Sequence, residues 1–516
     1  MASVSQNTLT AQESNLQWTP EFSMQFRQIG GTDLSPDGKY VAYVVREALT
    51  EGEKSEYLQH IWVAATDGSL EVQYTRGEKS SYAPSFSPDG QQIAFLSDRS
   101  GKTQVWSMRL MGGEAEQITE SKTGIASFQW SPQGDRIAFL AKDEETEEEE
   151  KAKKEKRAVI MVDQNYKYNH LYTITMELGE DKKRQIQRLT QGEFHISSFD
   201  WSPDGSQIVF SHKENPSINS SRSGYDISMV AADSSAIRTI VAQDGSDDSP
   251  YFSPDGRHIA FVSDNGQPEP IGLGDLYLYA LGSGKMTALP HTPDRNASLM
   301  GWTADGKGLL FSEALNTSRT AMLLPISDVL QGRKGRGQAK ALCPLDGTSG
   351  SIDFDSQTEK MAFVYQTPDQ AAELYVAQAD GSGQKALTSI NSKIELPAMG
   401  KTELIKWKSK DGLEVEGLLT YPVNFEPGKK YPTILQIHGG PAGVFTKGFT
   451  GNPSIYLTQY FAEQGFFVLR PNPRGSAGYG KDFRYANFRD WGYGDFEDLM
   501  SGVDKVVADG MADEER

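Results

Sequence analysis

The sequence predicts an all-β, seven-bladed β-propeller at residues 30–394, followed by part of an α/β domain at residues 395–516. Three observations favour this fold class. A turn motif recurs about every 50 residues, apolar strands follow each copy, and after Thr388 the pattern changes to alternating strands and helices. A chain of 516 residues also exceeds what one hydrophobic core organises, so two or more domains are expected.

The recurring turn has the form S-P-D-G and follows an aromatic residue or leucine. Proline presets φ for the first central position, and Asp and Gly suit the positions after it. Each turn precedes an alternating strand such as YVAYVV, then a third strand such as HIWVAAT, and a fourth is expected before the next copy. Four strands repeated seven times are typical of a propeller, and a β-sandwich is the alternative. The seven copies, of which the last two are weaker, lie at 34–38, 86–90, 130–134, 201–205, 252–256, 302–306 and 354–358.

Two segments stand outside this repeat. Residues 1–29 contain Trp18, Phe22 and Phe26 and are predicted to pack against the second domain. An insertion at 143–157 carries eight acidic and five basic residues, a composition that indicates a solvated loop or a short exposed helix. The aromatic stretch at 166–170 follows this insertion, is expected to begin a strand, and is a candidate for lining the central cavity.

The second domain begins with a predicted hairpin over 402–421. A short strand at 433–437 ends at His438, and a helix is predicted over 453–464, where Gly465 ends it. Another strand follows at 466–469. Apolar residues at helical spacing then predict a helix that Gly510 closes: Phe496, Leu499, Met500, Val503, Val506 and Val507.

The segment His438-Gly439-Gly440-Pro441 comes directly after a predicted strand. Acyl-transfer enzymes need backbone N–H groups that face a developing oxyanion, and HGGG-type loops supply one in esterases. Glycine is expected there because a Cβ would block the close approach of a substrate carbonyl. The alternative is a plain tight turn.

The order of motifs makes the prediction more specific. HGGP is followed by NPRGSAGYG at 472–480, by DWG at 490–492, and by a helix that carries Asp495 and Asp498. With the phased turns, this order resembles the prolyl oligopeptidase family of serine peptidases, in its acylaminoacyl-peptidase and dipeptidyl-peptidase branch. The resemblance implies a seven-bladed propeller that precedes an α/β-hydrolase domain.

The resemblance also implies site residues. The backbone N–H of Gly440 is the expected oxyanion donor, without help from a side chain, because His438 stands where some relatives have tyrosine. The residues expected to shape the substrate site beside it are His438, Gly439, Arg474 and Tyr479, and packing within the loop is the alternative for Arg474 and Tyr479.

The family's catalytic Ser, Asp and His follow the helix at 494–509, and no G-x-S-x-G occurs in the 516 residues. Six of the seven histidines fall in the propeller, and the seventh is His438. Ser476 is not a candidate nucleophile, since Arg474 occupies the first glycine position of such an elbow. The expectation is therefore half of a hydrolase domain, without the triad and inactive on its own.

The function implied is a serine-type exopeptidase or oligopeptidase that releases acylaminoacyl or dipeptidyl units from short peptides, with the propeller as a filter. The alternative is a non-catalytic propeller that binds peptides or proteins and carries a degenerate hydrolase half. Besides short peptides, the expected partner is the missing C-terminal part of the same polypeptide, and a homo-oligomer is left open.

Composition narrows the remaining possibilities. A net charge of −19 argues against broad nucleic-acid binding, and no run of 18 apolar residues suggests a membrane span. The N-terminus lacks the pattern of a secretory signal, and the single cysteine, Cys343, fits a reducing compartment, so a cytoplasmic location is expected. No cofactor or metal is expected.

Overall fold

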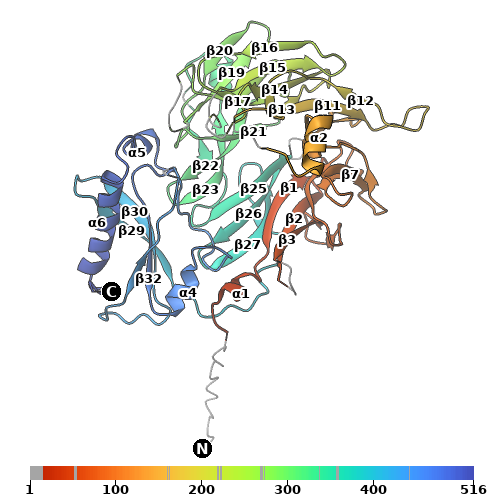
Figure 1. Ribbon diagram of the computed structural model, residues 1–516. Helices are drawn as coiled ribbons and strands as arrows, with labels where there is room; N and C mark the ends of the chain where they lie inside the picture. The colour runs from red at the N-terminus through yellow and green to blue at the C-terminus, as the bar shows by residue number, and fades with distance from the viewer. Residues whose placement is uncertain are drawn as a thin grey trace, which may run out of the picture.

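The computed structural model describes residues 16–515, apart from short gaps at 51–54, 160, 162, 218–219, 221–223, 268–270, 272, 336, 356–358 and 441. In this part of the chain, seven four-stranded antiparallel sheets follow one another from β1 to β28 (Figure 1). An eighth sheet, β29 to β32, is mixed and carries helices. The first seven sheets form a propeller-like ring, as the sequence predicts.

The strands of the ring have the following bounds. The first two sheets are β1 (Gln28–Leu34), β2 (Tyr40–Leu49), β3 (Glu56–Ala65) and β4 (Glu71–Gln73), then β5 (Ser81–Phe86), β6 (Gln92–Ser97), β7 (Gln104–Arg109) and β8 (Glu116–Gln117). The next two are β9 (Ile125–Trp130), β10 (Arg136–Lys142), β11 (Asn169–Thr175) and β12 (Ile186–Arg188), then β13 (His195–Trp201), β14 (Gln207–Lys213), β15 (Asp226–Ala231) and β16 (Ile237–Val241). The fifth is β17 (Asp247–Phe252), β18 (His258–Ser263), β19 (Asp275–Ala280) and β20 (Lys285–Ala288). The last two are β21 (Ser298–Trp302), β22 (Gly308–Leu315), β23 (Ser318–Pro325) and β24 (Lys340–Ala341), then β25 (Thr348–Asp355), β26 (Lys360–Thr367), β27 (Gln370–Gln378) and β28 (Lys385–Ala386).

The repeated turn joins the first two strands of each sheet. In the first copy the Ser35 hydroxyl donates to Asp37 Oδ1 at 2.7 Å and accepts from the Tyr40 amide at 2.9 Å. The glycine that closes the turn has a φ between 63° and 72° in six copies, a region that residues with a Cβ rarely adopt. The seventh copy, at 354–358, lies partly outside the described residues. The S-P-D-G signal is therefore a local hydrogen-bonded turn, which the described residues show in six of the seven sheets.

Neighbouring sheets are held together by apolar packing and by side chains that bond to the next sheet. The Asp33 and Asp200 carboxylates accept from the amides of Phe86 at 2.6 Å and Phe252 at 2.8 Å, which end the first strand of the following sheet. Asp353 in the seventh sheet accepts from Leu34 N at 2.7 Å in the first. A shared apolar cluster of Val41, Tyr43, Ala362 and Leu374 covers the same junction. The seventh sheet thus returns to the first and closes the ring.

The eighth sheet has the order β29 (Thr402–Lys408), β30 (Glu414–Thr420), β32 (Phe467–Asn472) and β31 (Thr433–Leu435). β31 and β32 pair in parallel, and α6 (Gly494–Ala508) packs on the sheet through a core that includes Leu419, Phe467 and Val506. The remaining helices are α1 (Pro20–Ser23), α2 (Glu147–Lys154), α3 (Ser327–Leu330), α4 (Thr458–Glu463) and α5 (Lys481–Tyr485). No helix in the described part of the chain is long and apolar enough to cross a membrane.

The N-terminal segment lies against the eighth sheet's helix α4 (Figure 1). Trp18 is 1% exposed, its backbone N–H donates to Glu463 at 3.0 Å, and its indole N–H donates to Ala398 O at 2.9 Å. The rings of Phe22, Phe26 and Phe449 pack with it. β1 begins at Gln28, so the last two residues of the predicted N-terminal segment belong to the first sheet.

Two other elements differ from the sequence prediction or refine it. The helix predicted over 453–464 begins only at Thr458, because the Ser454 hydroxyl accepts from the Tyr456 amide and forms a local turn in place of the first helical turn. The acidic insertion forms the exposed helix α2, which Thr146 and Glu149 cap reciprocally. Of the two forms predicted there, a solvated loop or a short exposed helix, the structure has the helix.

Candidate active site

The predicted oxyanion loop begins at His438, after two residues that follow β31, because the strand predicted over 433–437 ends at Leu435. Gly440 has a φ of 54°, and its carbonyl accepts from the Gly443 amide at 2.5 Å, so the loop closes as a tight turn. Among the described residues, none accepts a hydrogen bond from the Gly440 amide, and a Cβ at this position would meet no atom within 4 Å. The backbone angle therefore favours glycine at this position, while the space beside it would admit a Cβ. Pro441 lies outside the described residues.

His438 is half-buried and packs inside the site. Its Nε2 lies 3.2 Å from the Ser476 hydroxyl, and its ring lies edge to face against Phe445 with centroids 5.1 Å apart. Burial lowers the pKa of His438, which favours the neutral imidazole. The side chain thus connects the HGGP loop to the RGSAGYG loop.

The contact between His438 and Ser476 does not make a catalytic pair. Ser476 is fully buried, and its hydroxyl donates to Pro473 O at 2.6 Å. The other ring nitrogen, His438 Nδ1, has no partner among the described residues, whereas a catalytic base needs an orienting group there. The exclusion of Ser476 as the nucleophile therefore has a structural basis as well as a sequence one.

Arg474 and Tyr479 lie in the RGSAGYG loop, but both point into protein. Arg474 donates to both carboxylate oxygens of the fully buried Asp498, at 3.0 and 2.8 Å, and also pairs with Asp411 at 2.8 Å. The hydrogen bonds to Asp498 raise the pKa of the guanidinium. The Tyr479 hydroxyl donates to Glu416 Oε1 at 3.0 Å and accepts from Asn472 at 2.9 Å. Neither side chain lines the two cavities that the oxyanion side of the domain shares with the ring.

Asn472, which sequence reasoning missed, joins the two loops. Its side-chain carbonyl accepts from the Phe445 amide at 2.7 Å, and its amide group donates to Phe445 O at 3.0 Å and to Tyr479. These bonds fix the segment that follows HGGP against the end of β32. An asparagine within N-P-R-G-S gives no sequence signal for this role, because its partner is 27 residues earlier.

The RGSAGYG loop is also attached to the ring. Asp294, from the loop before β21, accepts from the Gly480 amide at 2.9 Å and forms an ion pair with Arg484. Both side chains of this pair are almost wholly buried, with exposures of 0% and 2%. The Asn316 amide donates to Gly478 O at 2.8 Å beside it. The ring therefore positions the loop that supports the candidate oxyanion turn.

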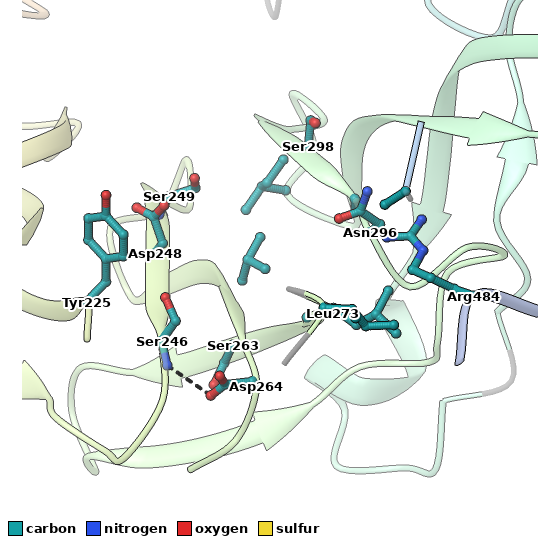
Figure 2. A pocket seen from close by; sticks show the side chains of 16 residues that line it. Tyr225, Ser246, Asp248, Ser249, Ser263, Asp264, Leu273, Asn296, Ser298 and Arg484 are labelled. Atoms are coloured by element: carbon teal, nitrogen blue, oxygen red, sulfur yellow. Dashed lines mark hydrogen bonds between the residues drawn. The ribbon is translucent and has the colours of Figure 1, made fainter. Parts of the chain in front are cut away.

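A cavity of about 470 Å³ lies where the ring meets the HGGP loop. Figure 2 shows polar side chains of the ring around it, with Arg484 on the opposite wall. Ala442, two residues after Gly440, lines it, and so do the carboxylates of Asp248 and Asp264. The cavity thus places acidic and hydroxyl groups beside an exposed glycine turn.

The aromatic stretch at 166–170 occupies a different place. It leads into β11, where the rings of Tyr168, His170 and Phe194 contact one another in series. None of its residues lines either of these two cavities. Its prediction as a wall of the central cavity stays a prediction.

A propeller-like ring joined to an α/β sheet, with an open glycine turn beside a shared cavity, indicates a two-domain hydrolase. Comparison with known proteins agrees. Residues 454–516 match the prolyl oligopeptidase family, residues 21–170 the TolB β-propeller domain, and residues 152–265 the N-terminal region of dipeptidyl peptidase IV.

Relatives align over almost the whole chain. The uncharacterized peptidase YuxL of Bacillus subtilis is 29% identical over 92% of this chain and 73% of its own length. The dipeptidyl-peptidase 5 of Porphyromonas gingivalis is 27% identical over 96% of this chain and 74% of its own length. The acylaminoacyl peptidase of Pyrococcus horikoshii has the same fold, with a TM-score of 0.75 at 21% identity over 97% of this chain and 74% of that structure. Over almost its whole length the chain is thus similar to peptidases, and residues 454–516 match the prolyl oligopeptidase family of serine peptidases.

Proposed function

We propose that this protein is a serine peptidase that hydrolyses short peptides, and that residues 1–516 supply its substrate cavity and one oxyanion donor. One observation carries the proposal: the Gly440 amide has no acceptor within the described residues, and Ala442, two residues later, lines a cavity that is otherwise formed mostly by the ring. A backbone N–H held in this way stabilises the oxyanion of a tetrahedral intermediate without reorganising during the reaction.

The architecture assigned to this function has three parts. We infer that the seven sheets are the seven blades of one propeller over residues 30–394, and that residues 395–516 are the N-terminal half of an α/β-hydrolase domain. The predicted N-terminal segment 1–29 packs on the α/β portion through its described residues, supported by the contacts of Trp18 with Glu463 and Ala398; residues 1–15 lie outside the described part of the chain. A closed ring over the site admits short peptides and excludes folded proteins.

The roles of the predicted site residues follow from their partners. Gly440 donates to the oxyanion, and Gly439 leaves room for the substrate chain beside it. His438, Arg474 and Tyr479 position the two loops through Ser476, Asp498 and Asn472. We propose that these three side chains hold the site in place and that the residues lining the cavity contact the substrate.

The nucleophile comes from outside these 516 residues. The sequence contains no G-x-S-x-G, and the buried hydroxyl of Ser476 already donates to a carbonyl. We propose that the Ser, Asp and His of the triad belong to a C-terminal part of the same polypeptide. In that enzyme the serine hydroxyl attacks the scissile carbonyl carbon, and histidine accepts the proton of the hydroxyl. The carbonyl oxygen becomes an oxyanion, which accepts a hydrogen bond from the Gly440 N–H.

The substrate class is a short peptide from which an acylaminoacyl or dipeptidyl unit is released. Relatives named dipeptidyl-peptidase 5 support dipeptide release. The carboxylates of Asp248 and Asp264 in the cavity suit the ammonium group of a free N-terminus. The single cysteine supports a reducing compartment such as the cytoplasm.

The test compares three proteins: residues 1–516, the product of the whole reading frame, and that product with Gly440→Val. Each is incubated with a fluorophosphonate serine probe and with chromogenic dipeptidyl and acylaminoacyl substrates. Covalent labelling and turnover are expected only for products that contain residues after 516. Labelling of 1–516 at any serine would show that the nucleophile is misassigned.

The same experiment decides the alternative function. If neither product is labelled and neither turns over substrate, while peptides still bind, the protein is a propeller that binds peptides and carries a degenerate hydrolase half.

A further inference from the structure

A second cavity, of about 560 Å³, lies between the ring and the segment that follows the HGGP loop. Its walls come from β1, β23 and β25–β27 on the ring and from residues 445–458 and β32 on the other side. Three arginines line it, Arg27, Arg319 and Arg470, and among the described residues no aspartate, glutamate or lysine does. In a chain with a net charge of −19, this concentration of positive charge is unexpected from composition.

Arg470 is the unusual member of the three. It lies on the buried strand β32, its residue is 7% exposed, and its Nε and Nη2 are buried without a hydrogen-bond partner among the described residues. Burial lowers its pKa to about 10, which still leaves the guanidinium charged at neutral pH. A buried charge without a partner is strongly unfavourable, so such a group is normally paired.

Other arginines of the chain show what pairing looks like here. Arg474 and Arg484 are also buried, and each lies against a buried carboxylate, Asp498 or Asp294. Arg27 pairs with Glu47 at 3.2 Å. Arg319, like Arg470, has no ion pair among the described residues. The cavity therefore holds one buried arginine without a carboxylate partner among the described residues, Arg470, and a second cation, Arg319, whose charge interacts with that of Asp294 without a direct ion pair.

We propose that this cavity binds a carboxylate, with Arg470 as its buried ion-pair partner and Arg319 as a second cation. The planar guanidinium presents parallel N–H groups that match both oxygens of a carboxylate. The ring of Phe445 lies 5.8 Å from the Arg470 guanidinium carbon and, with Ile29 and Val364, gives the cavity an apolar surface for neighbouring side chains.

The position of the cavity indicates which carboxylate it receives, and this step rests on the proposed function. Phe445 lies between the two sites: its ring is 5.1 Å from the His438 ring and 5.8 Å from the Arg470 guanidinium. An extended residue spans roughly 3.3–3.6 Å, so these two distances place a carboxylate on Arg470 at most about three residues from the His438 ring. We therefore assign the site to the C-terminal carboxylate of a short peptide, with an acidic side chain as the other source of the same group.

Binding is measured by calorimetry on residues 1–516 with three acetylated peptides of Gly and Phe. The first has a free C-terminal carboxylate, the second a C-terminal amide, and the third an amide with glutamate as its last residue. The free acid is expected to bind about ten-fold or more tightly than the amide, since a buried charged hydrogen bond is lost with the carboxylate. If the glutamyl amide binds as weakly as the plain amide, the site recognises a terminal carboxylate. If it binds as tightly as the free acid, the site also accepts an acidic side chain.

The variant Arg470→Met keeps the side chain's length and removes the charge, so it should abolish the preference for the acid. Arg319→Gln should reduce the preference for the acid. If Arg470→Met fails to fold, the Arg319→Gln variant provides the test of the charge requirement in its place. Arg257→Met, at an exposed turn of the ring, is the matched control and should leave the preference unchanged. Equal affinity for acid and amide in the unaltered chain, or a full preference in folded Arg470→Met, would overturn the inference.

These outcomes are separate from those of the proposed function. If the acid is preferred but the product of the whole reading frame never cleaves peptides, the carboxylate site stands and the peptidase assignment fails. If the product cleaves peptides but the acid and the amide bind equally, the peptidase assignment stands and the carboxylate site fails.

Discussion

The ion pair between Asp294 and Arg484 should hold the ring to the α/β portion, and Asp294→Asn tests this. Asparagine keeps an oxygen that can accept from the Gly480 amide, now at 2.9 Å, but it removes the charge that faces Arg484. The substitution therefore isolates the electrostatic contribution of the pair. Asp294→Ala removes the hydrogen bond as well.

The magnitude follows from burial. Asp294 is fully buried and Arg484 is 2% exposed, and removal of one partner from a buried pair costs about 3–5 kcal/mol because the other charge stays desolvated. Arg484 keeps a further interaction, so we expect about 3 kcal/mol for Asp294→Asn. The lost bond to Gly480 should add about 1–3 kcal/mol in Asp294→Ala.

The measurement is urea unfolding followed by circular dichroism and tryptophan fluorescence. Asp275→Asn is the matched control, because Asp275 pairs with Arg295 within the ring and that pair is more exposed. We expect about 1 kcal/mol or less from it. Replacing both partners, as in Asp294→Leu with Arg484→Met, should recover part of the loss. The reasoning is refuted if Asp294→Asn is as stable as the control variant, or if the double variant is no more stable than Asp294→Ala.

Three further predictions concern the oxyanion turn, the ring and the supporting loop. Gly440→Val in the product of the whole reading frame should lower kcat by about 10²–10³ with little change in KM, and an unchanged kcat in a folded variant excludes Gly440 from the mechanism. Burial raises the pKa of Asp200 to about 7, above its ordinary 3.8, so its contribution to stability is complete below about pH 4 and is lost as pH rises through 7. Asp200→Asn, which still accepts from Phe252, should thus gain about 4 kcal/mol at pH 8 and little at pH 4 in urea unfolding; equal gains at both pH values contradict the assignment. Asp498→Ala should lower the free energy of unfolding by about 3–5 kcal/mol in the same measurement, because the charge of Arg474 stays buried. A loss below about 1 kcal/mol shows that Asp411 suffices as the ion-pair partner of Arg474.

The sequence by itself determined the elements that depend on neighbouring residues. The turn at Ser35 could be predicted because its hydroxyl, its Asp and its Gly act within six residues, and the same rule placed a strand after each copy. The HGGP loop and the exposed acidic helix α2 were predictable for the same reason, since both follow from contiguous residues. The helix before Gly465 was predicted too long because a single hydroxyl, that of Ser454, holds its first residues in a turn.

Only the tertiary structure decided which distant groups meet. The closure of the ring at Asp353 and Leu34 joins residues 319 positions apart, and the order β29-β30-β32-β31 depends on how the sheet packs under α6. Arg470 and Arg474 stand four positions apart in one segment, yet packing gives Arg474 a carboxylate and leaves Arg470 facing a cavity without one. Local sequence specifies which conformations a segment prefers, but the partner of a buried charge is set by what packing brings beside it, and that depends on the whole fold.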